Sequence, residues 1–102
     1  MKIVYTPQAR EDLREIKQYI SNNLQNPIAA KNVTDGIIKS THRLSLMQNL
    51  GVELSEKTGR ETDYRCLFSG NYGIFYIAFD DAVRIYRILD LRTDYMRIIL
   101  SE

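Results

Sequence analysis

The chain has 102 residues, a formal net charge of +1 and 44% hydrophobic residues. This length and composition predict one globular domain over residues 1–102 and argue against a disordered or multi-domain chain. A net charge near zero argues against nucleic-acid binding through bulk electrostatics, although four C-terminal arginines could form a local basic patch: Arg84, Arg87, Arg92 and Arg97.

Residues 2–5 form a short β-prone run that stops at Thr6-Pro7, a threonine suited to an N-cap and a proline suited to the first helical position. A helix is predicted to start there and to end near Asn22-Asn23. Its apolar residues recur every three or four positions and share one stripe: Ala9, Leu13, Ile16, Ile20 and Leu24. We interpret the opposite, charged face as solvated rather than as a partner contact. It carries Arg10, Glu11, Arg14, Glu15 and Gln18.

A second helix is predicted from Asn26-Pro27, which repeats the cap-and-proline signal and implies a tight helical hairpin. The helical spacing continues for about five turns. It runs through Ala30, Val33, Ile37, Thr41, Leu44 and Met47. The pattern then breaks over residues 48–63, which we interpret as a loop that has room for a little local structure.

Three strands are predicted at residues 64–68, 72–79 and 83–91, joined by short turns into an antiparallel meander. The middle strand is largely apolar on both faces, as expected of an interior strand covered on one side by helices. Thr93-Asp94 can cap a last short helix. With residues 2–5 added as an edge strand, the fold is α+β, in the order β-α-α-β-β-β. Its helical hairpin packs on an antiparallel sheet and a short C-terminal helix follows.

Neither a cofactor nor a metal is expected. Cys66 is the single cysteine, and we expect it to be a buried strand residue rather than a reactive thiol. His42 has no second histidine or cysteine cluster near it in the sequence. No apolar run approaches the roughly 20 residues that span a bilayer, so we expect a cytoplasmic protein without a membrane partner.

The order of these elements and their motifs resembles the RelE/ParE superfamily of bacterial type II toxins. The motifs are Tyr5-Thr6-Pro7, Asn26-Pro27, Tyr64-Arg65, Gly70-Asn71-Tyr72, Phe75-Tyr76, and Arg87-Ile88-Leu89 leading to Arg92-Thr93-Asp94. The resemblance spans nearly the whole chain. It implies a toxin held inactive by a cognate antitoxin, whose helical or disordered segment wraps the toxin and folds on binding.

The resemblance implies one of two activities. RelE-like members cleave messenger RNA on the ribosome, whereas ParE-like members poison DNA gyrase without cutting RNA. RelE-like nucleases carry an arginine directly after the tyrosine that opens the middle strand, and this chain has Gly73 there. Losing one such charge typically costs roughly 10²- to 10³-fold in rate. A ParE-like, non-enzymatic gyrase poison is therefore favoured. The alternatives are a ribosome-dependent endoribonuclease and a non-toxic relative that only binds a partner.

The residues expected to bind the target or the antitoxin are all arginines. These are Arg65, Arg84, Arg87, Arg92 and Arg97. For Arg65, a partner contact and an internal ion pair with an acid such as Glu61 or Asp63 are both open. For Arg92 the partner contact is favoured over pairing with Asp90 or Asp94.

If the chain were a metal-independent nuclease, its catalytic candidates would be Arg65, Arg92 and Tyr95, because RNA cleavage needs cationic stabilisation and a proton donor. Tyr72 and Tyr76 are expected to pack in the core rather than to do chemistry.

Overall fold

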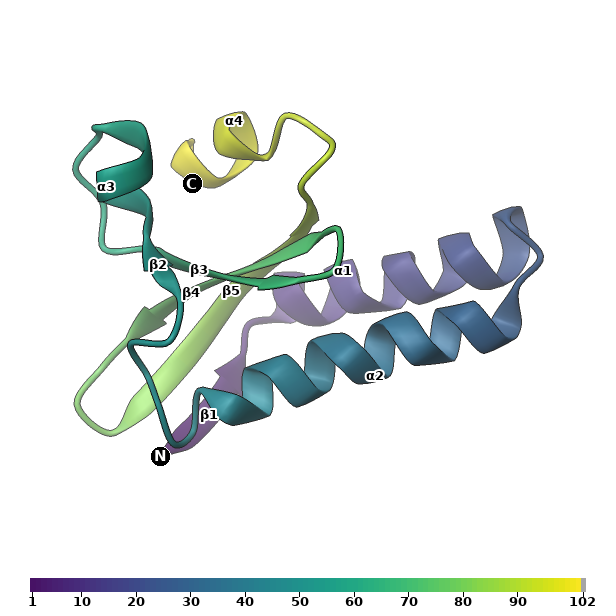
Figure 1. Ribbon diagram of the computed structural model, residues 1–102, viewed down its shortest axis with the longest axis horizontal. Coiled ribbons are helices and arrows are strands. Elements are labelled where there is room, and N and C mark those ends of the chain that lie inside the picture. The colour runs from purple at the N-terminus through teal and green to yellow at the C-terminus, as the bar shows by residue number, and fades with distance from the viewer. Residues whose placement is uncertain (102) are drawn as a thin grey trace.

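The computed structural model describes residues 1–101, which form a five-stranded sheet between two layers of helices (Figure 1). The strand order is β1-β5-β4-β3-β2. The elements are β1 Lys2–Tyr5, α1 Pro7–Gln18, a π-helical turn Tyr19–Asn23, α2 Pro27–Arg43, β2 Val52–Glu53, α3 Leu54–Thr58, β3 Arg65–Ser69, β4 Tyr72–Ala78, β5 Ala82–Asp90 and α4 Tyr95–Leu100. The predicted α+β fold, with its helical hairpin and short C-terminal helix, is confirmed.

Both predicted helix starts are confirmed by their caps. The Thr6 hydroxyl accepts a hydrogen bond from the Ala9 backbone N–H at 3.1 Å, and the Asn26 carboxamide oxygen accepts one from Ala29 at 3.0 Å. The π-helical turn extends α1 to Asn23, close to the predicted end. The cap predicted for α4 is only half right, because Asp94 precedes the helix but its side chain makes no capping hydrogen bond.

The sheet corrects two expectations. Strand β1 runs parallel to β5, with Lys2 opposite Ala82 and Tyr5 opposite Ile85, so the sheet is mixed rather than wholly antiparallel. The helical hairpin and the meander separate these strands, so no tight turn forces them to be antiparallel. The sheet also has a fifth strand, because the segment expected to be a loop with a little local structure contains β2 as well as α3. A two-residue strand is too short to show the alternation by which strands are predicted from sequence.

Strand β4 is apolar on both faces, as predicted, because each face lies against a different cluster. Tyr72, Ile74 and Tyr76 pack with the helical hairpin, and Phe75 packs on the other side with residues of α3 and α4. The buried tyrosines confirm the expectation that they are core residues. Cys66 is also buried, and burial raises the pKa of its thiol to about 12, so it is protonated at neutral pH.

Tyr76 anchors the irregular segment that follows α2. Its hydroxyl donates to the Gln48 carbonyl at 2.8 Å and accepts from the Gly51 N–H at 2.9 Å. A Cβ at position 51 would lie 2.8 Å from the Tyr76 ring, so this close approach requires glycine. Through this contact the core residue Tyr76 fixes the chain just before β2.

Candidate partner-binding surfaces

Arg87 is held inside the fold rather than presented on the surface. Its Nε donates to Asp12 Oδ2 at 2.8 Å and its Nη2 donates to Oδ1 at 3.1 Å, and only 14% of its side chain is exposed. Asp12, on α1, also accepts the Ile88 backbone N–H at 3.0 Å, beyond the stretch of β5 that pairs with β1. The expected surface cation is therefore an internal link between α1 and the sheet.

Arg65 also has partners within the chain. Its Nη1 donates to the Gly51 carbonyl at 2.8 Å, and its Nη2 lies 3.0 Å from a carboxylate oxygen of Glu53. The internal ion pair that the sequence left open is therefore present, but its acid is Glu53 rather than Glu61 or Asp63. Glu53 lies directly opposite Arg65 in the ladder between β2 and β3, and β2 was not predicted.

Arg92 is the most exposed of the ion-paired candidates, with 64% of its side chain accessible. It forms a two-pronged pair with Asp90, at 3.0 Å from Nε and 2.8 Å from Nη2. The hydrogen bond from this guanidinium lowers the pKa of the Asp90 carboxyl. Beside it, burial and the Asp90 charge raise the pKa of the Tyr72 hydroxyl. Arg92 therefore has an internal acid partner and still faces solvent.

The three catalytic candidates do not converge. Arg65 is opposite Tyr76 in the ladder, whereas Asp90, which holds Arg92, is opposite Tyr72 at the other end of β4. Four residues of strand separate these ends, or about 13 Å. Tyr95 packs on the Phe75 ring, with centroids 5.6 Å apart. Arg65, Arg92 and Tyr95 therefore do not form one catalytic site in this structure.

Gly73, where the resemblance places an arginine in RelE-like nucleases, is closely packed. A Cβ there would lie 2.7 Å from Leu91 Cδ2, 2.9 Å from Phe75 Cε2 and 3.0 Å from Cys66 Sγ. Contacts this short require the neighbouring core side chains to shift. The close packing of the sheet around Gly73 therefore disfavours a cationic side chain at this position.

Arg84 lies on the part of the sheet that the short helices leave open. It is exposed and alternates with the buried Val83 and Ile85, so it points away from the helical hairpin. Its guanidinium carbon lies 5.3 Å from the centroid of the Phe79 ring, and Phe79 is itself 43% exposed. Arg97 is exposed on α4, in a shallow depression shared with Arg60.

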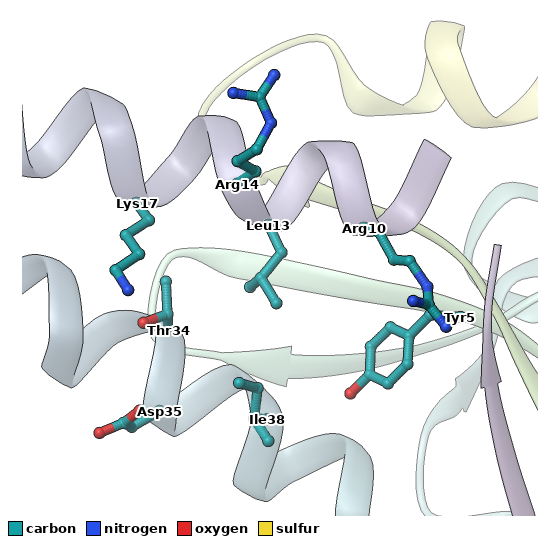
Figure 2. Close-up of a pocket in the computed structure, with 8 residues that line it drawn as sticks. All are labelled: Tyr5, Arg10, Leu13, Arg14, Lys17, Thr34, Asp35 and Ile38. Carbon is teal, nitrogen blue, oxygen red and sulfur yellow. The ribbon is translucent and has the colours of Figure 1, made fainter. Parts of the chain in front are cut away.

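A groove of about 530 Å³ lies between α1 and α2, and sequence reasoning missed it (Figure 2). Leu13 and Ile38 face each other across it, and Arg10 and Lys17 line its α1 side (Figure 2). The signal was present in the sequence, because Arg10, Arg14 and Lys17 recur at spacings of four and three on one stripe. What the sequence could not show is that Ile38 of α2 remains 45% exposed beside them.

Residues 1–101 contain no group of three or more histidine, cysteine, aspartate or glutamate side chains placed to hold a metal ion. Within the same residues, no helix has the length and apolar character that a membrane crossing requires.

Comparison with known proteins gives a consistent result. Residues 3–95 match the family model described as the ParE toxin of the type II toxin-antitoxin system parDE. A solved structure of the chromosomal ParDE toxin-antitoxin system from P. aeruginosa is similar in fold, with a TM-score of 0.73 and 20% sequence identity. The match covers 89% of this chain and 96% of that one. No curated protein matches the sequence.

Proposed function

This chain belongs to the ParE family of type II toxin-antitoxin toxins, and we propose that it inhibits bacterial growth by binding DNA gyrase until a cognate antitoxin neutralises it. The proposal treats residues 1–102 as a single toxin domain acting in the cytoplasm. It assigns the chain a binding role rather than an enzymatic one.

The main observation that supports this proposal is the close packing around Gly73. Metal-free RNA cleavage depends on preorganised cations around the scissile phosphate. At Gly73 an added Cβ would meet three core atoms at 3.0 Å or less, and Arg65 is already bonded to Gly51 and Glu53. These observations favour a toxin that binds its target over one that cuts RNA.

Among the arginine candidates, we propose Arg92 as the main target contact, with Arg84 and Arg97 as further exposed cations. Arg65 and Arg87 are left out of this surface because their guanidinium groups are engaged within the fold. Arginine is well suited to such contacts because its planar fork recognises carboxylates and phosphates through two hydrogen bonds.

Pulse labelling of DNA and protein synthesis, in one bacterial culture induced without antitoxin, tests the target. We expect thymidine incorporation to fall first, together with DNA-damage signalling and trapped gyrase–DNA cleavage complexes. An early collapse of methionine incorporation, with new messenger-RNA 5′ ends, would instead identify the ribosome as the target. Normal growth with folded protein present would indicate a non-toxic relative.

A further inference from the structure

A hollow of about 350 Å³ lies where α1 faces the ends of β4 and β5. Its residues from the helical hairpin include Asp12, Ile16 and, just beyond α1, Tyr19, which share one stripe at spacings of four and three. Arg10 and Lys17, which line the groove between the two long helices, lie on the opposite side of α1. The hollow is therefore separate from that groove.

The hollow is lined by three carboxylates, and only two of them are neutralised. Asp12 is bonded to two nitrogens of Arg87 at 2.8 and 3.1 Å. Asp90 is bonded to two nitrogens of Arg92 at 3.0 and 2.8 Å. The third acid, Glu15, is exposed and forms no ion pair within residues 1–101. The hollow therefore has an excess of negative charge and is complementary to a cation.

The Tyr72 hydroxyl is a polar group that the fold does not use. Tyr72 is only 9% exposed, yet its hydroxyl forms no hydrogen bond within the described part of the chain, whereas that of Tyr76 forms two. Tyr72 lies directly opposite Asp90 in the ladder between β4 and β5, so their side chains share one face of the sheet. Burial raises the pKa of the Tyr72 hydroxyl, and Asp90 and Tyr19 raise it further, so this oxygen lies toward the hollow that both residues line. A ligand in the hollow can bond to it.

Tyr19 forms the exposed rim of the hollow. It is 52% exposed and begins the π-helical turn, in which the Leu24 N–H donates to the Tyr19 carbonyl at 3.2 Å. Single π-helical turns are rare and occur frequently at functional sites. The face of a tyrosine ring attracts a cation, more often an arginine guanidinium than a lysine ammonium.

An organic cation fits these groups better than a metal ion does. Among residues 1–101 no three acids, histidines or cysteines are close enough to hold a metal ion together, so the carboxylates of the hollow are spread apart. A guanidinium has five N–H donors in a planar fork and can bond to acceptors that are spread in this way. The volume of the hollow is within the range of small-ligand sites, roughly 300–1,000 Å³.

We propose that this hollow binds a guanidinium group, with Glu15 as its carboxylate partner, the Tyr72 hydroxyl as a further acceptor and the Tyr19 ring against its face. The guanidinium can belong to an arginine of a protein partner or to a free alkylguanidine. When Arg92 exchanges Asp90 for an acceptor on a partner, Asp90 is released and adds a second carboxylate to the hollow. Binding of the guanidinium does not depend on which cellular target the toxin has.

An NMR titration of the ¹⁵N-labelled chain tests this binding. The probe is a blocked Gly-Arg-Gly peptide, and its control contains citrulline, which has nearly the shape of arginine without its charge. We expect the arginine peptide to shift the amide signals of Glu15, Tyr19 and Tyr72 with a dissociation constant of about 1 mM, as expected for one side chain. The citrulline peptide should bind about tenfold more weakly or not at all. Equal binding of the two peptides, or of neither, would overturn the proposal.

A second probe, propylguanidine, distinguishes the two sources of the guanidinium. Binding of the arginine peptide alone identifies a protein side chain as the ligand, and binding of propylguanidine alone identifies a free guanidine. Binding of both shows that the guanidinium is sufficient by itself. In each case the affinity should weaken as salt is raised.

Two matched pairs of variants locate the binding. Glu15→Gln should weaken the arginine peptide by about fivefold or more, whereas Glu56→Gln, at an exposed glutamate of α3 outside the hollow, should not. Tyr72→Phe should also weaken the peptide without lowering the melting temperature, because its hydroxyl has no partner among residues 1–101. Tyr76→Phe should do the reverse, because its hydroxyl holds the segment before β2.

Circular dichroism confirms that each variant is folded. If Glu15→Gln and Tyr72→Phe bind the arginine peptide as tightly as the unchanged chain, the peptide binds elsewhere and the proposal is wrong. It is also wrong if inorganic phosphate shifts the signals of the hollow and the arginine peptide does not, because the arginines would then decide the charge of the site. Growth inhibition is scored separately, so a toxic chain that binds no guanidinium leaves the gyrase proposal intact.

Discussion

Two aspartate–arginine pairs of this protein have the same two-pronged geometry, but one is buried and the other is exposed. Asp12 and Arg87 are 75 residues apart in sequence, and their side chains are 5% and 14% exposed. Asp90 and Arg92 are two residues apart, and Arg92 is 64% exposed. Burial and sequence separation distinguish these pairs, whereas their hydrogen-bond distances are nearly the same.

The difference shows which cations can take part in recognition. Removing one partner of a buried pair leaves an uncompensated charge in the protein, so Arg87 cannot turn toward another molecule at little cost. An exposed pair contributes little to stability because water and salt screen it. Arg92 can therefore exchange Asp90 for an acceptor on a partner, which makes it the better candidate for target binding.

Removing the buried carboxylate should have the largest effect. We expect Asp12→Ala to lower the free energy of unfolding by about 3–5 kcal/mol, because Arg87 loses its partner and the Ile88 N–H loses its acceptor. Urea denaturation followed by circular dichroism measures this loss. Asp90→Ala is the matched control and should cost much less. Equal losses in the two variants would contradict the distinction between the pairs.

Removing the exposed arginine should affect activity rather than folding. We expect Arg92→Ala to relieve growth inhibition in cells without antitoxin while leaving the melting temperature essentially unchanged. Lys31→Ala, which removes another exposed ion-paired cation, serves as the control and should leave growth inhibition intact. An Arg92→Ala variant that is still fully toxic would remove this residue from the proposed surface.

Double-mutant cycles compare the pairs directly. The coupling free energy between Asp12 and Arg87 should be about 1 kcal/mol or more, as expected for contacting residues in one network. The cycle for Asp90 and Arg92 should show only weak coupling in moderate salt. In both cycles Asp→Asn keeps the shape of the carboxylate and removes its charge, and Arg→Gln removes the guanidinium. A strongly coupled Asp90–Arg92 pair would indicate that Arg92, too, is held by the fold.

The smallest effect concerns the titration of Asp90. Its pKa is lowered in the folded protein by the Arg92 hydrogen bond, so the pair stabilises the fold above the unfolded pKa of the carboxyl. That stabilisation is lost as the pH falls through the lower, folded pKa. In Arg92→Gln we expect the pKa of Asp90 to move back up, as measured by carbon-detected NMR titration of its carboxyl. An unchanged pKa would mean that another group depresses it.

The helices could be predicted because their signals are local. Thr6-Pro7 and Asn26-Pro27 each combine a cap with a proline, and both helices begin there. The meander could also be predicted from the sequence, because short turns force neighbouring strands to pair. The parallel pairing of β1 with β5 has no local signal, because it depends on how the finished hairpin packs on the sheet.

The roles of the arginines were harder to predict because their partners lie elsewhere in the sequence. Arg65 is neutralised by Glu53, in a strand too short to recognise from sequence. Arg87 was expected on the surface because nothing near it in the sequence reveals Asp12 on α1. For Arg92 the right acid, Asp90, is two residues away and was among the acids considered from sequence, although a partner contact was favoured over this pairing.

The parallel pairing of β1 and β5 also constrains when this protein can fold during its synthesis. Lys2 lies opposite Ala82, and Asp12 needs Arg87 and Ile88, so β1 and α1 cannot complete these contacts until β5 has been synthesised. Such long-range contacts slow folding and leave strand edges exposed until they form. We expect nascent chains that end before β5 to remain unfolded. An incompletely translated toxin would then be harmless to its host and readily degraded.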